Sequence, residues 1–521
     1  MNKFETIKAA KDGLDILPDI ERYARIGWEA ITDDDKVRMK WYGLFFRKHT
    51  PGYFMLRIRM PNGIATANQI RTVGELANEF GRGELDLTTR QQVQLRWFRI
   101  EHVPEIFARL AAVGLEVRQT GMDNIRNVMG CPLAGITTHE LLDASPAAQA
   151  YTARFVGNKA FSNLPRKFNV AITGCMDNCV LLETQDIALS PATRQVDGET
   201  VVGFNVMIGG KQGSGGYTAA QPLDVFARPD EADEVCAEIT LIFRDHGPRE
   251  SRSKARLAFL VQEWGTERIR AELQSRLGRS LERAGRDVRH TYHADHIGVE
   301  PQTERGLYSV GLAVPVGRLK AEHAIGLAEL AGTYGNGEVR LTPGQNVMLT
   351  HVPNTHLPSL LAEPLLRELR ADPAPSIRGT VSCIGVGLCD LALTDTKGDA
   401  LRVARRLEQT IPLGRSMAIN WSGCPAACGS HHVADIGLQG GKARVNGQVV
   451  EVYQVFVGGR QGPLARQALP VLNAIPATEI DGVMERLVQA HTDGRDLMAV
   501  GTEIAEALGQ GQPRVKREVV A

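Results

Sequence analysis

The chain contains a long internal repeat. Residues 83–95, GELDLTTRQQVQL, and residues 337–349, GEVRLTPGQNVML, are identical at seven of thirteen positions. The match continues between residues 125–131 and 377–383, and between residues 169–189 and 418–438. This repeat is far longer than the period of a solenoid, so a duplication is the simplest interpretation. We therefore expect two pseudo-symmetric halves, and a shared site where they meet, because clefts favour such seams.

The local patterns predict the same mixture of elements in both halves. Alternating apolar residues in YFMLRIRM, KFNVAITG and SMAINWSG indicate strands, and helical spacing in DALRVARRLEQT indicates a helix. Around the repeat, helix-like and strand-like segments alternate in the same order. These patterns predict an α+β fold with mixed sheets flanked by helices. Residues 1–45 lie outside the repeat, and the polar segment 271–305 is the expected linker between the halves.

Charge and composition exclude several classes of partner. The 521 residues carry 60 lysines and arginines against 60 aspartates and glutamates, which favours neither nucleic acid nor a membrane surface. No segment resembles a signal peptide or a membrane span, so we expect a cytoplasmic monomer. In a reducing compartment the eight cysteines are metal ligands, catalytic thiols or buried small residues rather than disulfides.

Four cysteines of the second half form two close pairs. Cys383 and Cys389 are separated by five residues, and Cys424 and Cys428 by three. Both pairs lie in glycine-rich turns, where the backbone can approach an inorganic core closely. Four converging thiolates suit a [4Fe-4S] cluster. Spacing alone leaves two alternatives open, which are structural zinc and unpaired core cysteines.

The complete pattern resembles a known signature. The C-x5-C pair, a gap of thirty-four residues, GCPAACG and then VADIGLQG resemble the siroheme and [4Fe-4S] signature of assimilatory nitrite and sulfite reductases. The resemblance implies that Cys383, Cys389, Cys424 and Cys428 bind the cluster. It further implies that Cys428 is the axial thiolate of the siroheme iron.

The resemblance also implies a domain order, because it covers most of the chain. Each half is expected to contain a ferredoxin-like half-domain, at residues 46–115 and 306–370. Each half-domain is followed by a mixed-sheet nitrite/sulfite reductase domain, at residues 120–270 and 375–510, with the cofactors at the seam.

The first half keeps only part of the cysteine pattern. Cys131, Cys175 and Cys179 align with Cys383, Cys424 and Cys428, whereas Thr137 aligns with Cys389. A second cluster would need a substitute ligand, and the family has one cluster. We therefore interpret the three cysteines as a remnant of the duplication, which an iron count can check.

The substrate residues are expected in the first half. Reduction of an oxyanion needs fixed positive charge around its oxygens and a proton donor within reach. By the resemblance, Arg90 in TTRQ, Arg126 in DNIRNVMG and Lys167 in LPRKFN match the cationic substrate-site positions. The alternating pattern places Arg90 on a strand face shared with Gln92, Gln94 and Arg96, and the repeat has glycine at the position of Arg90.

Asn169 is the residue that favours nitrite over sulfite. Sulfite reductases of this family usually carry a second lysine at this position, two residues after Lys167, whereas nitrite reductases carry asparagine. A site with one fewer cation suits an anion with less charge and fewer oxygens. Gly121 supports the same choice, because a branch of sulfite reductases has a cysteine there.

The expected function is the six-electron reduction of nitrite to ammonia. No G-x-G-x-x-G follows a strand, and the resemblance implies reduced ferredoxin as electron donor. Ferredoxins are usually acidic, so basic residues should receive them. Sulfite reduction with the same cofactors stays open, and a non-catalytic iron-sulfur electron carrier and a tetrapyrrole-modifying oxygenase are less favoured, because both leave the substrate residues unexplained. Candidate docking residues are Arg38, Lys40, Arg47, Lys48 and the basic run from Arg249 to Arg256.

Overall fold

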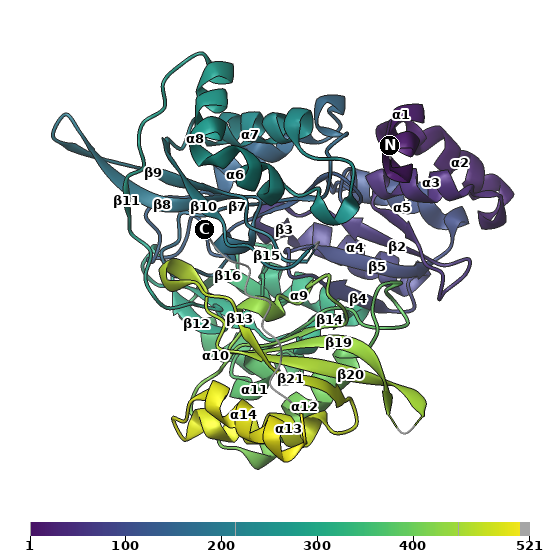
Figure 1. Cartoon of the computed structure of the whole chain (residues 1–521), viewed down its shortest axis with the longest axis vertical. Coiled ribbons are helices and arrows are strands. Elements are labelled where there is room, and N and C mark those ends of the chain that lie inside the picture. The colour runs from purple at the N-terminus through teal and green to yellow at the C-terminus, as the bar shows by residue number, and fades with distance from the viewer. Residues whose placement is uncertain (1, 214, 446, 511–521) are drawn as a thin grey trace. The chain divides into compact units, whose positions relative to one another are not determined.

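The chain divides into two compact units. The computed structural model describes residues 2–213, 215–445 and 447–510. Unit 1 extends to Asp372, and unit 2 begins at Pro373 (Figure 1). The division does not follow the sequence repeat, because both copies of the residue 83–95 pattern lie in unit 1.

Unit 1 begins with three short helices, each of which starts at an identifiable signal. The Asn2 side chain accepts hydrogen bonds from the first backbone N–H groups of α1, Pro18 stands at the start of α2, and Thr32 caps α3. Their bounds are α1 (Lys3–Ala10), α2 (Leu17–Ile26) and α3 (Asp33–Arg38).

Two five-stranded sheets follow, and each half of the repeat supplies one strand to the sheet of the other half. The first sheet has the order β1-β2-β5-β4-β14, and the second has the order β12-β13-β16-β15-β3. Strand β14 comes from the second half but pairs with β4, and β3 comes from the first half but pairs with β15. The strands of the first sheet are β1 (Leu44–Phe46), β2 (Phe54–Ile58), β5 (Val93–Phe98), β4 (Glu84–Leu87) and β14 (Arg318–Lys320). Those of the second are β12 (Gly298–Pro301), β13 (Leu307–Leu312), β16 (Val347–Pro353), β15 (Glu338–Leu341) and β3 (Ile64–Thr66).

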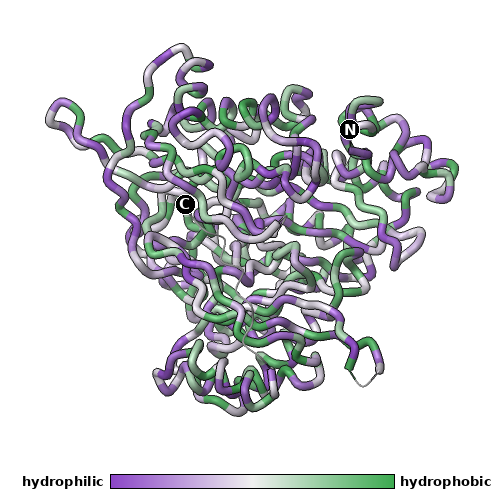
Figure 2. The backbone as a smooth tube through the Cα atoms, in the orientation of Figure 1, coloured by the Kyte–Doolittle hydropathy of each residue, from purple (hydrophilic) through white to green (hydrophobic). Residues whose placement is uncertain are grey.

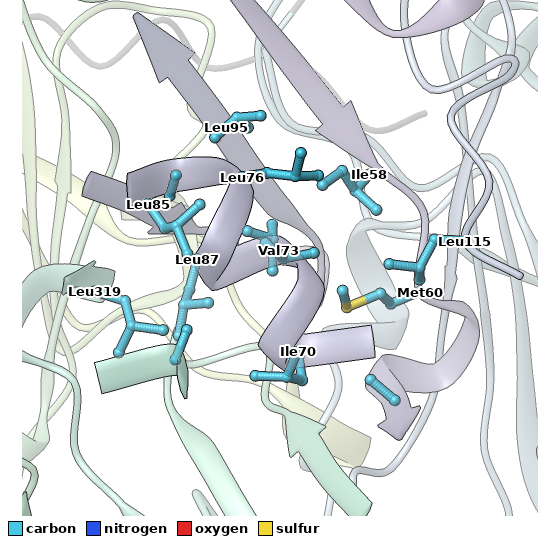
Figure 3. Packing of buried hydrophobic residues seen from close by; sticks show 14 of the residues in the cluster. Ile58, Met60, Ile70, Val73, Leu76, Leu85, Leu87, Leu95, Leu115 and Leu319 are labelled. Atoms are coloured by element: carbon cyan, nitrogen blue, oxygen red, sulfur yellow. The ribbon is translucent and has the colours of Figure 1, made fainter. Parts of the chain in front are cut away.

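The exchanged strands share one hydrophobic core. Helix α4 (Ala67–Phe80) packs against its repeat partner α9 (Ala321–Tyr334). Leu319 of β14 pairs with Leu85 and lies among Leu87, Val73 and Ile70 of the first half (Figure 3). The two half-domains are therefore one body rather than two. The remaining helices of this region are α5 (Val103–Ala112) and α10 (Leu357–Leu361).

Two glutamines tie the half-domains together at their turns. Gln91 Nε2 donates to the carbonyl of Leu341 at 2.9 Å, and Gln345 Nε2 donates to the carbonyl of Leu87 at 2.9 Å. Both glutamines are buried and both have left-handed backbone, with φ of 54° and 64°. The two hydrogen bonds are equivalent under the duplication. TTRQ and TPGQ share only their threonine and glutamine, and the shared glutamines are the two donors.

The two larger sheets have the same topology. Unit 1 contains the order β10-β9-β8-β7-β6, and unit 2 contains β21-β20-β19-β18-β17. In each, the first three strands along the chain are parallel and the last two pairings are antiparallel. The unit 1 strands are β6 (Ile125–Met129), β7 (Phe168–Ile172), β8 (Ile187–Val196), β9 (Glu199–Ile208) and β10 (Gln221–Ala227). The unit 2 strands are β17 (Thr380–Ser382), β18 (Ile419–Ser422), β19 (Ile436–Val445), β20 (Gln448–Val457) and β21 (Leu469–Pro476).

Helices cover one face of each larger sheet (Figure 1). Hydrophilic and hydrophobic segments alternate along these helices in Figure 2, as expected where only one helix face is buried. In unit 1 they are α6 (Ser145–Phe155), α7 (Ala232–His246) and α8 (Leu257–Leu277). In unit 2 they are α11 (Pro375–Arg378), α12 (Thr396–Thr410), α13 (Ile480–Thr492) and α14 (Leu497–Ala507). None of the helices in the described ranges is both long and apolar enough to cross a membrane.

The segment expected as a linker, residues 271–305, is built into unit 1. It contains the end of α8, strand β11 (Arg286–Asp287), which pairs with β8, and strand β12. Between these strands, residues 288–297 lie against the loop that follows β7, through hydrogen bonds such as His290 N to the carbonyl of Met176 at 2.8 Å.

We predict that Gln345→Met lowers the thermal midpoint of unfolding by a few degrees. The substitution keeps the side-chain volume but removes the donor to Leu87, and a buried carbonyl left without its partner costs about 1–3 kcal/mol. Gln195→Met is the matched control, because Gln195 lies exposed on β8 and bonds only Thr200 across the hairpin. Equal midpoints for the two variants, measured by calorimetry, would contradict a structural role for the glutamine pair.

Candidate functional site

Arg90 lies in the turn between β4 and β5, so the expectation of a strand position was wrong. The Thr88 hydroxyl accepts hydrogen bonds from the backbone N–H of Arg90 at 3.2 Å and of Gln92 at 3.1 Å. The left-handed backbone of Gln91 then turns the chain into β5. Because of this turn, Arg90 does not share a face with Gln92, Gln94 and Arg96. Arg96 is instead buried in an ion pair with Asp86.

The turn brings Arg90 to Asn169. The Arg90 Nε–H donates to the Asn169 Oδ1 at 3.2 Å, across 79 residues of sequence. Asn169 lies on β7 and is buried. Its backbone N–H donates to Asp186 at 2.8 Å, and Asp186 also accepts two hydrogen bonds from the buried Arg256, at 2.9 and 2.6 Å. The carboxylate and guanidinium therefore position the strand that presents Asn169.

Arg126 lies on β6, and backbone carbonyls hold its guanidinium group. It donates to the carbonyls of Thr120 and Met122, the latter at 2.7 Å. Burial lowers the pKa of Arg126 well below its usual value, and the positive charges of Arg57 and Arg90 lower it further. Arg57 donates to the same Thr120 carbonyl at 2.9 Å.

The result is a concentration of positive charge in unit 1. Burial also lowers the pKa of Arg166 to about 10, with a further contribution from the cation Arg252. The buried carboxylate in this region, Asp123, accepts two hydrogen bonds from Arg252 and contacts Lys8 at 3.3 Å. These cations repel one another, and their N–H donors meet carbonyls more than carboxylates. A bound anion would therefore stabilise this group of positive charges.

Sequence reasoning missed Arg57 and Arg166. Arg57 interrupts the apolar strand YFMLRIRM, and Arg166 directly precedes Lys167 in LPRKFN. A charged residue inside an apolar strand was the available signal. Lys167 itself is half-buried and lies directly before β7, two residues from Asn169.

Gly121 has a packing reason as well as the expected functional one. A Cβ atom at this position would lie 2.4 Å from the carbonyl oxygen of Lys40 and 2.7 Å from the Phe45 ring. Any side chain here requires the N-terminal segment to move.

In unit 2, parallel strands bring the cluster cysteines to one edge. Cys383 directly follows β17, and Cys424 follows the neighbouring parallel strand β18. The Gly423 N–H donates to the Cys383 Sγ at 3.1 Å, a bond of the kind that tunes cluster sulfurs. Carboxyl ends of adjacent parallel strands meet at one edge, so one cysteine of each pair lies at the same edge of the sheet.

The electrostatics of this group fit a metal cluster. Burial raises the pKa of Cys424 to about 12, and the negative charges of Cys428, Cys383 and Cys389 raise it further. Burial also raises the pKa of Cys383. Burial therefore favours the protonated thiols of Cys383 and Cys424 unless a cation compensates their thiolates, and the iron of a [4Fe-4S] cluster would supply that compensation.

Cys428 differs from the other three because it is exposed. Its neighbours Ala427 and Ser430 have left-handed backbone, with φ of 55° and 62°, and the Gly429 N–H donates to the Ser422 hydroxyl of β18 at 3.1 Å. Gly429 is required behind it, since a Cβ there would lie 2.0 Å from the carbonyl oxygen of Trp421. The adjacent His431 is fully buried against Phe456 and is structural.

Two of the candidate ferredoxin-docking residues are wrong. Arg38 is buried, pairs with Asp35 at 2.8 Å and donates to the carbonyl of Ile7. Arg256 is fully buried against Asp186. Lys48 and Lys254 are exposed, whereas Lys40, Arg47, Arg249 and Arg252 are partly buried.

Known proteins resemble this chain over nearly its whole length. The family described as the nitrite and sulphite reductase 4Fe-4S domain matches residues 121–281 and 374–497. The nitrite/sulfite reductase ferredoxin-like half domain matches residues 46–113 and 300–366.

Individual relatives agree with these matches. A ferredoxin–nitrite reductase of Synechococcus elongatus is 44% identical, covering 94% of this chain and 96% of the relative. An assimilatory ferredoxin-dependent nitrite reductase of Haloferax mediterranei is 40% identical, covering 98% and 92%. The structure of the Mycobacterium tuberculosis NirA protein superposes with a TM-score of 0.90 at 31% identity, covering 95% of this chain and 94% of that one. The chain therefore belongs to the nitrite and sulphite reductase family, with the duplicated α+β fold and the 4Fe-4S domain of that family.

Proposed function

We propose that this protein reduces nitrite to ammonia with electrons from reduced ferredoxin. The observation that carries the proposal is the hydrogen bond between Arg90 and Asn169 within the cationic region of unit 1. Relatives from cyanobacteria, an archaeon and plants that align over most of this chain are named ferredoxin–nitrite reductases. We further propose that the protein acts as a monomer in the cytoplasm.

The side chains of unit 1 are proposed to bind and protonate the substrate. Reduction of nitrite to ammonium consumes six electrons and eight protons and releases two waters. Arg90 and Arg126 supply positive charge for an anion, and a bound anion would favour the charged form of Arg126, whose pKa burial lowers. Lys167 is the proposed proton donor, since an ammonium group can release a proton and take another from solvent.

Asn169 is proposed to set the preference for nitrite. Its amide carbonyl holds the Arg90 guanidinium at 3.2 Å and adds no charge of its own. A lysine here would add a cation beside Arg90 and remove the hydrogen bond that orients it. That change suits sulfite, which brings more negative charge than nitrite.

The cysteines of unit 2 are proposed to hold the redox groups. Cys383, Cys389, Cys424 and Cys428 would bind the [4Fe-4S] cluster, and Cys428 would also hold the siroheme iron. When bound, these groups supply one-electron redox chemistry.

The four family matches support the proposed domain order of residues 46–115, 120–270, 306–370 and 375–510. The exchanged strands add that residues 46–115 and 306–370 fold together.

We predict that anaerobically purified protein contains siroheme and a [4Fe-4S] cluster, and that it reduces nitrite faster than sulfite with chemically reduced ferredoxin. Iron, acid-labile sulfide and siroheme are quantified on the same sample that is assayed. Protein without siroheme would contradict the proposed function. A higher kcat/KM for sulfite would contradict only the proposed substrate.

We predict that Asn169→Lys lowers kcat/KM for nitrite by about ten- to a hundredfold and raises the ratio of sulfite to nitrite turnover. Asn158→Lys introduces the same charge at an exposed helix cap and should change neither. An unchanged ratio in Asn169→Lys, with cofactor content preserved, would exclude this residue as the determinant of substrate preference.

We predict that Cys428→Ser abolishes nitrite reduction and alters the siroheme absorption spectrum, because a serine hydroxyl is a poor ligand for soft metal sites. Cys236→Ser is the control, since Cys236 is buried among apolar side chains on α7 and is not one of the four proposed cluster ligands. A wild-type spectrum in Cys428→Ser would rule out the proposed axial thiolate.

A further inference from the structure

Unit 1 contains a second group of converging ligands. The sulfurs of Cys131, Cys175 and Cys179 and a ring nitrogen of His296 all lie within 4.8 Å of one another, and all four residues are buried. The Cys131 Sγ is 3.7 Å from the His296 Nε2. We propose that these four side chains bind a single zinc ion. This inference does not depend on the proposed reaction, because none of the four residues has a role in it.

The spacing fits one ion rather than a second cluster. Zinc–sulfur bonds of about 2.3 Å and zinc–nitrogen bonds of about 2.0 Å in a tetrahedron place neighbouring ligand atoms roughly 3.4–3.8 Å apart. The 3.7 Å separation of Cys131 and His296 lies in this range. In a [4Fe-4S] cluster each cysteine binds a different iron at a corner of the cube, so its sulfurs lie farther apart than ligands that share one ion. Three cysteines and one histidine are a common closed set for structural zinc.

Strands position two of the three thiols. Cys131 follows β6 and Cys175 follows the neighbouring parallel strand β7, in the same way that Cys383 and Cys424 follow β17 and β18. The backbone N–H of Leu133 donates to the Cys131 Sγ at 3.3 Å, and that of Asp177 donates to the Cys175 Sγ at 3.4 Å. Such N–H···S bonds orient thiolates toward a metal.

A segment outside the repeat supplies the fourth ligand. Residues 288–297 are held against the loop between Cys175 and Cys179 by several hydrogen bonds. The Ala294 N–H donates to the carbonyl of Asp177 at 3.0 Å, and the Asn178 amide donates to the carbonyl of Tyr292 at 2.8 Å. The Asp177 carboxylate accepts from the Tyr292 hydroxyl at 2.8 Å and faces the His290 ring at 2.8 Å. The segment is therefore fixed where it delivers His296.

The His296 ring is oriented as a metal ligand requires. Its Nδ1 lies 3.1 Å from the Glu300 carboxylate, so its Nε2 is directed at the sulfurs. A carboxylate behind a histidine is the usual partner that fixes the tautomer of a zinc-bound imidazole. His296 also has left-handed backbone, with φ of 57°. Gly311 is needed beside it, because a Cβ there would lie 1.8 Å from the His296 carbonyl oxygen.

A small apolar core explains these features less well. The cysteines do pack with Leu133, Ala134 and Met348. An apolar core does not explain the His296 imidazole, which is 2% exposed and lies against the Glu300 carboxylate. Burial of such a polar group costs free energy unless the group gains partners. Thr137, which aligns with Cys389, instead forms an isolated antiparallel β-bridge with Gln302 through the backbone. The first half has therefore lost the fourth cysteine of the cluster pattern, and its fourth ligand comes from the segment between the halves.

The test is metal analysis of the purified holoenzyme, expressed with zinc and dialysed against a chelator. We expect about one zinc per chain in addition to the cofactor iron. Cys179→Ala and His296→Ala should each lose this zinc, whereas the siroheme spectrum stays unchanged. Cys236→Ala and His49→Ala are matched controls that should keep it, since neither residue is among the four ligands and His49 is exposed. His296→Cys should keep the zinc that His296→Ala loses, because four cysteines are also a common closed set for structural zinc.

A second measurement covers variants that fail to fold. Wild-type protein expressed with cobalt should show thiolate-to-cobalt charge transfer and the visible bands of tetrahedral Co²⁺. Wild-type protein that contains no zinc and shows no such cobalt bands would overturn the proposal. Zinc that is retained in both ligand variants, or lost from Cys236→Ala, would also overturn it. Loss of extra iron and sulfide from Cys179→Ala would establish a second cluster at this position instead of a single ion.

Discussion

The exchange of strands between the two half-domains is the constraint on which unit 1 depends. Strand β14 completes the sheet of the first half, and β3 completes the sheet of the second, so neither sheet is whole without the other copy. Gln91 and Gln345 lie at the centre of this exchange, where each donates to the last residue of a strand in the opposite half. The turn that buries Gln91 is also the turn that carries Arg90. Assembly of the half-domains therefore places Arg90, which we propose as a substrate residue.

Backbone carbonyls orient part of the positive charge in the candidate substrate site. Arg126 and Arg57 donate to such carbonyls, which fix a guanidinium group without adding an opposite charge. The nearby carboxylates of Asp123 and Asp186 accept hydrogen bonds from Arg252 and Arg256, and Asp123 also lies 3.9 Å from Arg166. The arginines proposed to meet the anion are thus oriented in advance, which is what an electrostatically preorganised site requires.

The two larger sheets share a fold but carry different groups of ligand side chains. The larger sheets of the two units have the same order and the same pattern of parallel strands, and each presents cysteines at the ends of its first two strands. In unit 2 the group matches the cluster pattern of the family, whereas in unit 1 three cysteines meet a histidine. Pairing geometry is a property of the strands, so it survives divergence of the side chains that the strands display.

Much of this could be predicted from spacing and alternation. The α+β fold with pseudo-symmetric halves is confirmed, because a two-residue period and a repeated order of elements are local properties. The position of Arg90 was predicted wrongly because the left-handed Gln91 interrupts the strand, and an alternating polar pattern runs through that turn unchanged. Arg38 and Arg256 were predicted as surface cations because sequence gives the charge of a residue but not whether folding buries it against a carboxylate.

The sequence by itself determined the duplication, the two cysteine sets and the family of the chain, since each is written in residue identity and spacing. Only the tertiary structure decided which residues from different segments meet. Arg90 reaches Asn169 across 79 residues, and His296 reaches Cys131 across 165. The repeat places Thr137 opposite Cys389 and offers no other fourth ligand in the first half, because an alignment of the halves relates only residues within the repeat. His296 lies outside it, and hydrogen bonds to the loop at Asp177 and Asn178 bring it to the three cysteines.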